Sequence, residues 1–183
     1  VPSIRAVRFQ PLVQNREDYI AIVRALQLCN WSVEEFFCAG NWYLKNKYET
    51  FDGSGAALDS KLRHTIARKA KKVKADGGEI EIHSSSLAVK AHIDDYVEVY
   101  NRSWKETEPY EGFIRDMVEM FAERGALRLG MVRMDQTVIA AQIWFVMDGT
   151  ASIFKLAYDE RYKRYSAGTV LSGAMFRHAI EYD

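Results

Sequence analysis

The sequence has little of what metal-binding, secreted and membrane proteins usually need. Its 183 residues include only two cysteines and four histidines. The cysteines have no metal-ligand spacing and the histidines are scattered, so we expect no metal site. We expect Cys29 and Cys38 to be buried and reduced, as in cytoplasmic proteins. No signal peptide is visible in these residues, and we expect no membrane span because no apolar run is long enough to cross a bilayer.

Net charge is also missing, because 25 Lys and Arg balance 25 Asp and Glu. This balance gives no reason to expect nucleic acid or a membrane surface as a partner. The basic residues are nevertheless concentrated: residues 61–74 hold seven Lys or Arg and no acid. This run also has an apolar stripe. It is therefore either a helix with a solvated basic face or a site for RNA or a lipid-linked phosphate.

Hydrophobic residues make up 48% of the chain and aromatic residues 13%, which is enough for a packed core. Periodicity and turn residues predict two helices, a strand, two more helices, three strands and a final helix. The middle one of the three strands is apolar on both faces, so it should be central. The expected helices cover 16–28, 59–75, 87–103, 110–124 and 167–181, and the expected strands cover 78–83, 126–134, 137–147 and 151–159.

Two dipeptides, Asp135-Gln136 and Asp148-Gly149, are typical of two-residue hairpin turns between the last three strands. Counting back from these turns places Leu129, Gln142 and Lys155 in one row on one sheet face. Unpaired polar groups are costly to bury on an apolar face. We therefore expect Gln142 and Lys155 to be a catalytic or substrate-binding pair, with Lys155 holding an acidic group or an oxyanion. The alternatives are a lysine that extends to the sheet edge, or an ion pair with a helix carboxylate.

The segment KRYSAGTVL, residues 163–171, connects the last strand to the last helix. A helix N-terminus offers unpaired N–H groups and the positive end of a dipole, and both suit phosphate. Gly168 permits close backbone approach, whereas Ser166 adds a hydroxyl and Lys163 adds charge. The segment is therefore a candidate phosphate-binding turn. The alternative is that Ser166 simply caps a helix.

The element order and this loop together resemble the GNAT acyltransferase fold, an α/β fold with a mixed, mostly antiparallel sheet flanked by helices. In that family the loop binds the pyrophosphate of acyl-coenzyme A through Arg or Gln, two residues, Gly, one residue, and Gly or Ala. Lys163, Ser166 and Gly168 occupy the three defined positions here, so the first two differ from the motif. The resemblance implies acetyl-coenzyme A or another acyl-coenzyme A as co-substrate, and no metal. The implied cofactor site comprises Leu156, Ala157, Lys163, Arg164, Ser166, Ala167, Gly168 and Thr169.

Several stretches are similar to one GNAT subgroup, the Fem-related, CelD-like acetyltransferases that are often linked to bacterial polysaccharide biosynthesis. These stretches are YNRSWKETEPY, LRLGMV, IAAQIWFV, IFKLAYD and YSAGTVL. The resemblance implies that residues 50–183 form a GNAT-like acyltransferase lobe that lacks its C-terminal portion. Residues 1–49 would be the remnant of a preceding GNAT-like lobe. The acid that protonates the leaving thiolate would belong to the missing portion.

In this fold the junction of the two middle helices borders the acceptor groove. We expect Trp104 and Lys105 to bind substrate there, with Trp104 stacked on a sugar and Glu108 acting as a base or as a hydroxyl anchor. Tyr158, at the end of its strand, could reach the cofactor or the acceptor. The alternatives are that Trp104 is core, that Glu108 starts a helix, and that Tyr158 is simply half-buried. The catalytic candidates are Lys155, Gln142, Glu108 and Tyr158.

These inferences predict transfer of an acyl group to an amine or hydroxyl on a small-molecule or glycan-type acceptor, such as a sugar or cell-envelope intermediate. The acceptor would attack the thioester directly, and strand N–H groups near residues 156–158 would hold the oxyanion. Fem-type relatives use aminoacyl-tRNA, so tRNA-dependent aminoacyl transfer is a second interpretation. A third is a non-catalytic, GNAT-like binding lobe.

Overall fold

The computed structural model describes residues 4–10, 12–14, 16–40, 43–46, 50–51, 59–110 and 112–183. The chain divides into two compact units, Val1–Lys45 and Asn46–Asp183. The first unit contains helix α1 (Glu17–Leu28), none of whose residues is buried. Cys29 and Cys38 are free and exposed, so the expectation of buried cysteines is wrong. The physical reason is that the helix leading to Cys29 buries no side chain of its own.

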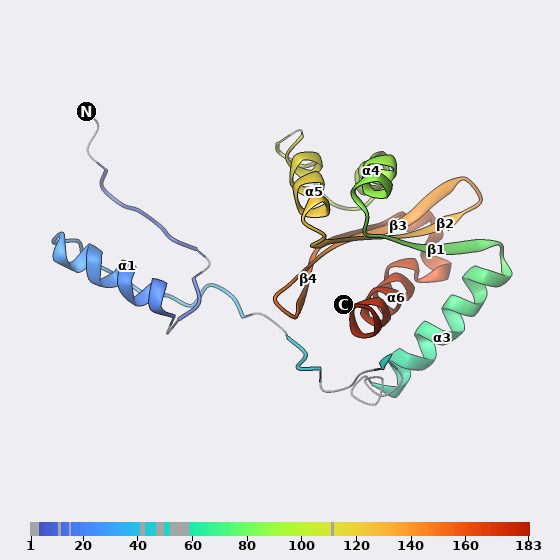
Figure 1. Ribbon diagram of the computed structural model, residues 1–183, viewed down its shortest axis with the longest axis horizontal. Helices are drawn as coiled ribbons and strands as arrows, with labels where there is room; N and C mark the ends of the chain where they lie inside the picture. The colour runs from blue at the N-terminus through green and yellow to red at the C-terminus, as the bar shows by residue number, and fades with distance from the viewer. Residues whose placement is uncertain are drawn as a thin grey trace. The chain divides into compact units, whose positions relative to one another are not determined.

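The second unit is a four-stranded antiparallel sheet with helices on both faces (Figure 1). The strand order β1-β2-β3-β4 follows the order of the sequence. The bounds confirm the predicted element order: α3 (Ser60–Ala75), β1 (Gly78–His83), α4 (Ser86–Asn101), α5 (Phe113–Glu123), β2 (Leu127–Met134), β3 (Thr137–Met147), β4 (Thr150–Tyr158), the 3-10 turn η2 (Glu160–Tyr165) and α6 (Ala167–Glu181).

Each face of the sheet has its own apolar core. Helices α4 and α5 cover one face, and α3 and α6 cover the other (Figure 1). The first core contains Val89, Tyr96 and Ile143, and the second contains Val132, Trp144 and Leu171. Strand β3 contributes to both cores and is buried from residue 138 to residue 144, which confirms its predicted central place.

The two predicted turns are present, because Met134 pairs with Thr137 and Met147 pairs with Thr150. Each hairpin also contains a β-bulge, however. Ile139 has no partner on β2, and Phe154 has none on β3. One extra residue reverses the face of every side chain beyond it.

The bulges make the predicted row of Leu129, Gln142 and Lys155 wrong. Leu129 pairs with Ile143, and Ile143 pairs with Lys155. Gln142 pairs instead with Gly130 on one side and with Leu156 on the other. Gln142 and Lys155 therefore lie on opposite faces of the sheet.

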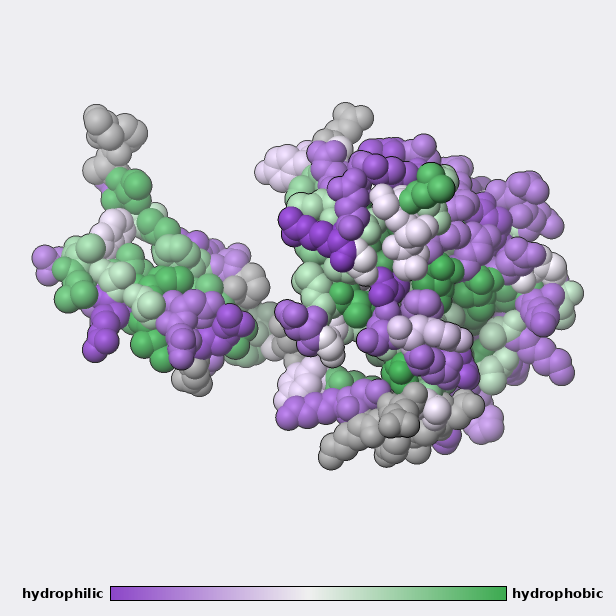
Figure 2. Space-filling model, viewed as in Figure 1, coloured by the Kyte–Doolittle hydropathy of each residue, from purple (hydrophilic) through white to green (hydrophobic). Residues whose placement is uncertain are grey.

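The basic helix α3 packs through its apolar stripe, as predicted. Asp59 caps it by accepting a hydrogen bond from Lys61 N at 2.7 Å. Val73 is buried, and Ile66 fills the space beside Gly173 of α6. The visible face of the sheet-containing unit is mostly polar, with smaller apolar areas between (Figure 2). Among the described helices, none is both long and apolar enough to cross a membrane.

Candidate active site

The C-terminal half of β4 has an open edge, because no described strand pairs with its outer side. The N–H of Asp159 donates to the carbonyl oxygen of Ile139 on β3 at 2.9 Å. Alternate residues of an antiparallel strand direct their N–H groups to opposite sides. The N–H of Ala157 therefore faces β3, whereas those of Leu156 and Tyr158 face the open edge. Two strand N–H groups can donate to a ligand there, and that of Ala157 is not one of them.

The loop after β4 leads through η2 to an uncapped helix. Ser166 has a left-handed backbone conformation (φ 51°, ψ 44°), and its side chain makes no capping hydrogen bond. The interpretation that its hydroxyl merely caps the helix is therefore wrong. Its carbonyl oxygen accepts from Val170 N at 3.0 Å, which is the first turn of the 15-residue α6. The N–H groups that start at Ala167 remain available for an anion.

Gly168 lies in the first turn of α6, directly against Tyr158. A Cβ atom at Gly168 would stand 3.4 Å from Cδ1 of Tyr158. On its other side, the Tyr158 ring meets Trp104, with ring centroids 4.5 Å apart and planes tilted by 46°. Tyr158 therefore connects the predicted cofactor loop to the predicted acceptor side.

Gln142 is 1% exposed and forms hydrogen bonds with the first two turns of α6. Its Nε2 donates to Gly168 O at 3.1 Å and to Ser172 Oγ at 2.8 Å. Its Oε1 accepts from Trp144 Nε1 at 2.8 Å. The prediction that Gln142 acts as a pair with Lys155 is wrong, because the bulges separate them. Gln142 instead fixes the start of α6.

Lys155 lies on the opposite face and forms an ion pair with Oε1 of Glu108. The two side chains are only 24% and 23% exposed. The Lys155 ammonium also lies 5.5 Å from the centroid of the Tyr100 ring. The ion-pair alternative is therefore confirmed. Its carboxylate belongs to the connection between α4 and α5 rather than to a helix, because α5 begins only at Phe113.

The charge states of Lys155, Glu108 and Tyr100 follow from the contacts among them. The hydrogen bond from Lys155 holds the pKa of Glu108 below its usual range, and Tyr100 and the charge of Lys105 act in the same direction. Burial alone would lower the pKa of Lys155, but the hydrogen bond to Glu108 and its charge raise it overall. Burial raises the pKa of Tyr100, and its hydrogen bond to Glu108 adds to the shift. At neutral pH the group is a lysine cation, a carboxylate and a neutral phenol.

The predicted substrate-binding residues border this group. Trp104 is 49% exposed, so it is not a core residue. The Lys105 ammonium lies 5.6 Å from the Trp104 ring centroid and 5.7 Å from that of Tyr100. Burial lowers the pKa of Lys105, and the charge of Lys155 lowers it further. A half-exposed indole beside a cation can stack on a ring of an acceptor.

The remaining loop residues differ in their contacts. Lys163 and Arg164 are exposed, Ala167 is buried and Thr169 is half-buried. The Arg164 guanidinium donates to Tyr165 Oη at 2.8 Å, and that hydroxyl donates to Asp76 at 2.8 Å. Tyr165 therefore joins the loop to Asp76 at the end of α3, and Arg164 holds the Tyr165 hydroxyl. The other basic residue of the loop, Lys163, makes no side-chain hydrogen bond of this kind within the described ranges.

Three residues near the site were not singled out from the sequence. Tyr100 and Tyr96 both lie in the helix predicted for residues 87–103. The buried hydroxyl of Tyr96 has no hydrogen-bond partner among the residues described. Asp159 is 2% exposed and accepts from Arg161 N at 3.0 Å, which starts η2. The signal in the sequence was an aspartate at the end of a predicted strand, because Asp often caps the turn or helix that follows.

Three solved structures share a partial likeness with this chain. The C-terminal domain of a protein described as a lysylphosphatidylglycerol synthetase from Agrobacterium fabrum is 18% identical, with a TM-score of 0.48; the match covers 67% of this chain and 37% of that one. A ribosomal-protein alanine N-acetyltransferase from Escherichia coli is 16% identical, with a TM-score of 0.44 and coverages of 55% and 59%. The PaiA N-acetyltransferase of Thermoplasma acidophilum, solved with coenzyme A, is 18% identical, with a TM-score of 0.43 and coverages of 55% and 72%.

The chain therefore spans well under two thirds of the first two of these proteins. No curated protein sequence matches it. Residues 60–183 match the profile of the Acetyltransferase (GNAT) domain. This match covers more than half of the chain and includes every strand that the structure describes, together with the α6 loop. The chain belongs to the GNAT acetyltransferase family.

Proposed function

We propose that this chain transfers an acyl group, in the simplest case acetyl, from acyl-coenzyme A to an amine or hydroxyl. The observation that carries the proposal is the uncapped N-terminus of α6 beside the open edge of β4. The helix end suits a pyrophosphate, and the outward N–H groups of Leu156 and Tyr158 suit a thioester oxygen. Family membership supports the same reading.

The cofactor side of the site would use mostly backbone groups. The N–H groups of Ala167, Gly168 and Thr169 would bind the pyrophosphate, and Lys163 would add charge. Gln142 would keep these N–H groups in place through its bond to Gly168 O. Coenzyme A would supply the activated thioester when bound.

The acceptor side would use the group around Lys155. Glu108, kept ionised by Lys155, would accept a hydrogen bond from the acceptor amine or hydroxyl. The acceptor atom would bond to the thioester carbon and lose its proton to Glu108, the C–S bond would break, and the thiolate would take up a proton from an acid outside this set. Trp104 and Lys105 would hold the acceptor. The half-exposed indole favours a ring such as a sugar.

The sequence motifs further support membership of the Fem-related, CelD-like subgroup, and hence an acceptor in bacterial polysaccharide or cell-envelope synthesis in the cytoplasm. On this proposal, residues 1–49 belong to a preceding lobe. The alternative donor, aminoacyl-tRNA, would need the basic face of α3. Lys69 and Lys72 of that helix already contact Arg164 O and Asp76 within the fold, which favours coenzyme A.

Calorimetric titration of acetyl-coenzyme A into the full chain tests the proposal. Gly168→Glu should abolish binding by placing bulk and negative charge beside the helix N-terminus. Gly168→Gln has the same bulk without the charge and should bind more tightly than Gly168→Glu. Gly168→Ala adds only a methyl group at ordinary contact distance and should bind nearly as well as the wild type.

A folded wild type that binds no acetyl-coenzyme A would overturn the proposal. Charged tRNA is then the next donor to test. Its binding should weaken with salt and on neutralising Lys69, Lys71 and Lys72 together. If neither donor binds, the lobe is a non-catalytic binding module.

A further inference from the structure

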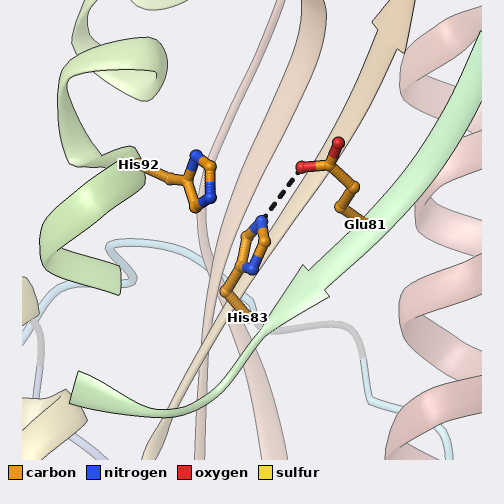
Figure 3. A group of neighbouring side chains, drawn as sticks. All are labelled: Glu81, His83 and His92. Atoms are coloured by element: carbon orange, nitrogen blue, oxygen red, sulfur yellow. Dashed lines mark hydrogen bonds and ion pairs between the residues drawn. The ribbon is translucent and has the colours of Figure 1, made fainter. Parts of the chain in front are cut away.

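Two histidines and a glutamate meet at the edge of the sheet opposite β4. Glu81 and His83 alternate along β1 and therefore point to the same face, where α4 supplies His92 (Figure 3). One potential ligand atom from each of the three lies within 4.8 Å of the others. All three residues are partly buried. This cluster could not be predicted from the sequence, since only the packing of α4 on the face of β1 brings the histidines together.

The cluster is held by a surrounding shell of charged groups. His92 Nδ1 donates to Asp95 Oδ2 at 3.2 Å, and Arg133 Nη2 donates to the same oxygen at 2.9 Å. Arg133 Nε donates to Glu81 Oε1 at 3.1 Å. Glu81 Oε2 is left to accept from His83 Nε2 at 3.1 Å. Two carboxylates and one guanidinium leave one net negative charge beside two imidazoles.

The network leaves one imidazole nitrogen of His92 without a protein partner among the described residues. The bond from His92 Nδ1 to Asp95 leaves its Nε2 with a lone pair, and no described residue donates to that atom. A histidine fixed by a carboxylate in this way is the usual arrangement of a metal ligand and its supporting acid. In Figure 3 the His92 ring lies beside the ring of His83. The side-chain exposures of 17% for His83 and 32% for His92 leave an entry path.

We propose that Glu81, His83 and His92 bind a divalent transition metal, with Zn²⁺ as the best fit. Two imidazoles and one carboxylate form a common three-ligand set for Zn²⁺, which leaves a fourth position for water or an external ligand. The metal takes the place of the proton that His83 Nε2 shares with Glu81, and that proton leaves to solvent. Asp95 and Arg133 orient the ligands without touching the metal.

The bound state requires one local rearrangement. The rings of His83 and His92 are now stacked, with centroids 4.2 Å apart and planes 18° apart. A metal lies in the plane of each imidazole that binds it, so one ring must leave the stack. His92, on the helix and the more exposed of the two, has the room to rotate. The metal would then join the edge strand β1 to α4, three strands away from the β4 edge.

Metal binding is measured on the full, tag-free chain with Zn²⁺ by calorimetry and with Co²⁺ by visible absorption. We expect one metal per chain, a tetrahedral Co²⁺ spectrum that Zn²⁺ removes, and a rise in melting temperature with Zn²⁺. His83→Ala and His92→Ala should each weaken binding at least about tenfold, and Asp95→Asn about 10–100-fold. His64→Ala removes an exposed histidine on α3 and should bind like the wild type.

The proposal is overturned by a wild type that binds neither metal, or by histidine variants that bind as tightly as the wild type. Far-UV circular dichroism of each metal-free variant shows whether it folds. Should an alanine variant fail to fold, His83→Gln and His92→Gln replace it, and the wild-type Co²⁺ spectrum decides independently. Neither result depends on coenzyme A, so the metal site can fail while the proposed acyl transfer stands.

Discussion

Gln142→Met tests whether a buried amide holds the first turn of α6. Methionine has a similar length and volume, so it removes the hydrogen bonds without opening a large cavity. The donors and acceptors affected are Trp144 Nε1, Gly168 O and Ser172 Oγ. Of these, Trp144 is 1% exposed and cannot turn to water.

The expected cost follows from these contacts. A buried indole N–H left without a partner costs about 1–3 kcal/mol. Each of the other two lost hydrogen bonds, to Gly168 O and to Ser172 Oγ, contributes about 0.5–1.5 kcal/mol. Together they predict a loss of about 2–6 kcal/mol in the free energy of unfolding. This is a large share of the stability of an ordinary domain.

Urea unfolding followed by circular dichroism measures the loss in the wild type and in a Trp144→Phe background. The phenylalanine has no N–H, so the cost of Gln142→Met should fall there by about 1–3 kcal/mol. Gln136→Met, in an exposed turn, is the control and should change stability by less than about 0.5 kcal/mol. If Gln142→Met costs the same in the wild type and in the Trp144→Phe background, the proposed bond between Gln142 and Trp144 is refuted. Such a result would favour a Gln142 side chain on the same face of the sheet as Lys155.

Two further outcomes are expected. Lys155→Met should raise the pKa of Glu108, because the hydrogen bond from Lys155 is the main cause that keeps it low and only Tyr100 and Lys105 then still oppose the effect of burial. Carbon NMR titration of that carboxyl measures the shift, and an unchanged pKa would contradict the ion pair. In the wild type, the Glu108 contribution to stability is present above the unfolded pKa and is lost as pH falls through the lowered folded value, so the variant should be less sensitive to acid. Gly78→Ala should cost about 1–3 kcal/mol, since its Cβ would lie 2.7 Å from Val73 Cγ1 and 3.0 Å from the Val73 carbonyl oxygen. Gly168→Ala meets only contacts of 3.4 Å or more and should be close to neutral; equal losses in a melt would refute this account of packing.

Local signals in the sequence were sufficient to predict the elements of the second unit. Asp148-Gly149 has positive φ at both positions (50° and 67°), as a two-residue hairpin turn of this kind requires. Asp59 caps α3 as its side chain predicts, and Gly125 ends the segment after α5 with φ 69°. These features depend on a few neighbouring residues, so they could be predicted without knowledge of the tertiary structure.

The register of the candidate site could not be predicted in the same way. Ile139 and Phe154, the bulged residues, are ordinary strand residues, and nothing beside them in the sequence marks an extra position. Whether a bulge forms depends on how α4 and α6 pack on the two faces. The ion pair of Lys155 and the meeting of His83 with His92 likewise depend on segments far apart in the chain. The sequence indicated the residue types, and the tertiary structure decided their partners.

The order of the strands has a consequence for the time course of folding. Strands β2, β3 and β4 are joined by two-residue turns, and hairpins of this kind close within about 1–10 μs. Strand β1 pairs with β2 only after the chain that includes α4 and α5 has folded back, which costs more entropy and takes longer. We expect the three-stranded meander that bears Lys155 and the open edge to form first. The edge that carries Glu81 and His83 would be the last part of the sheet to assemble and the first to open.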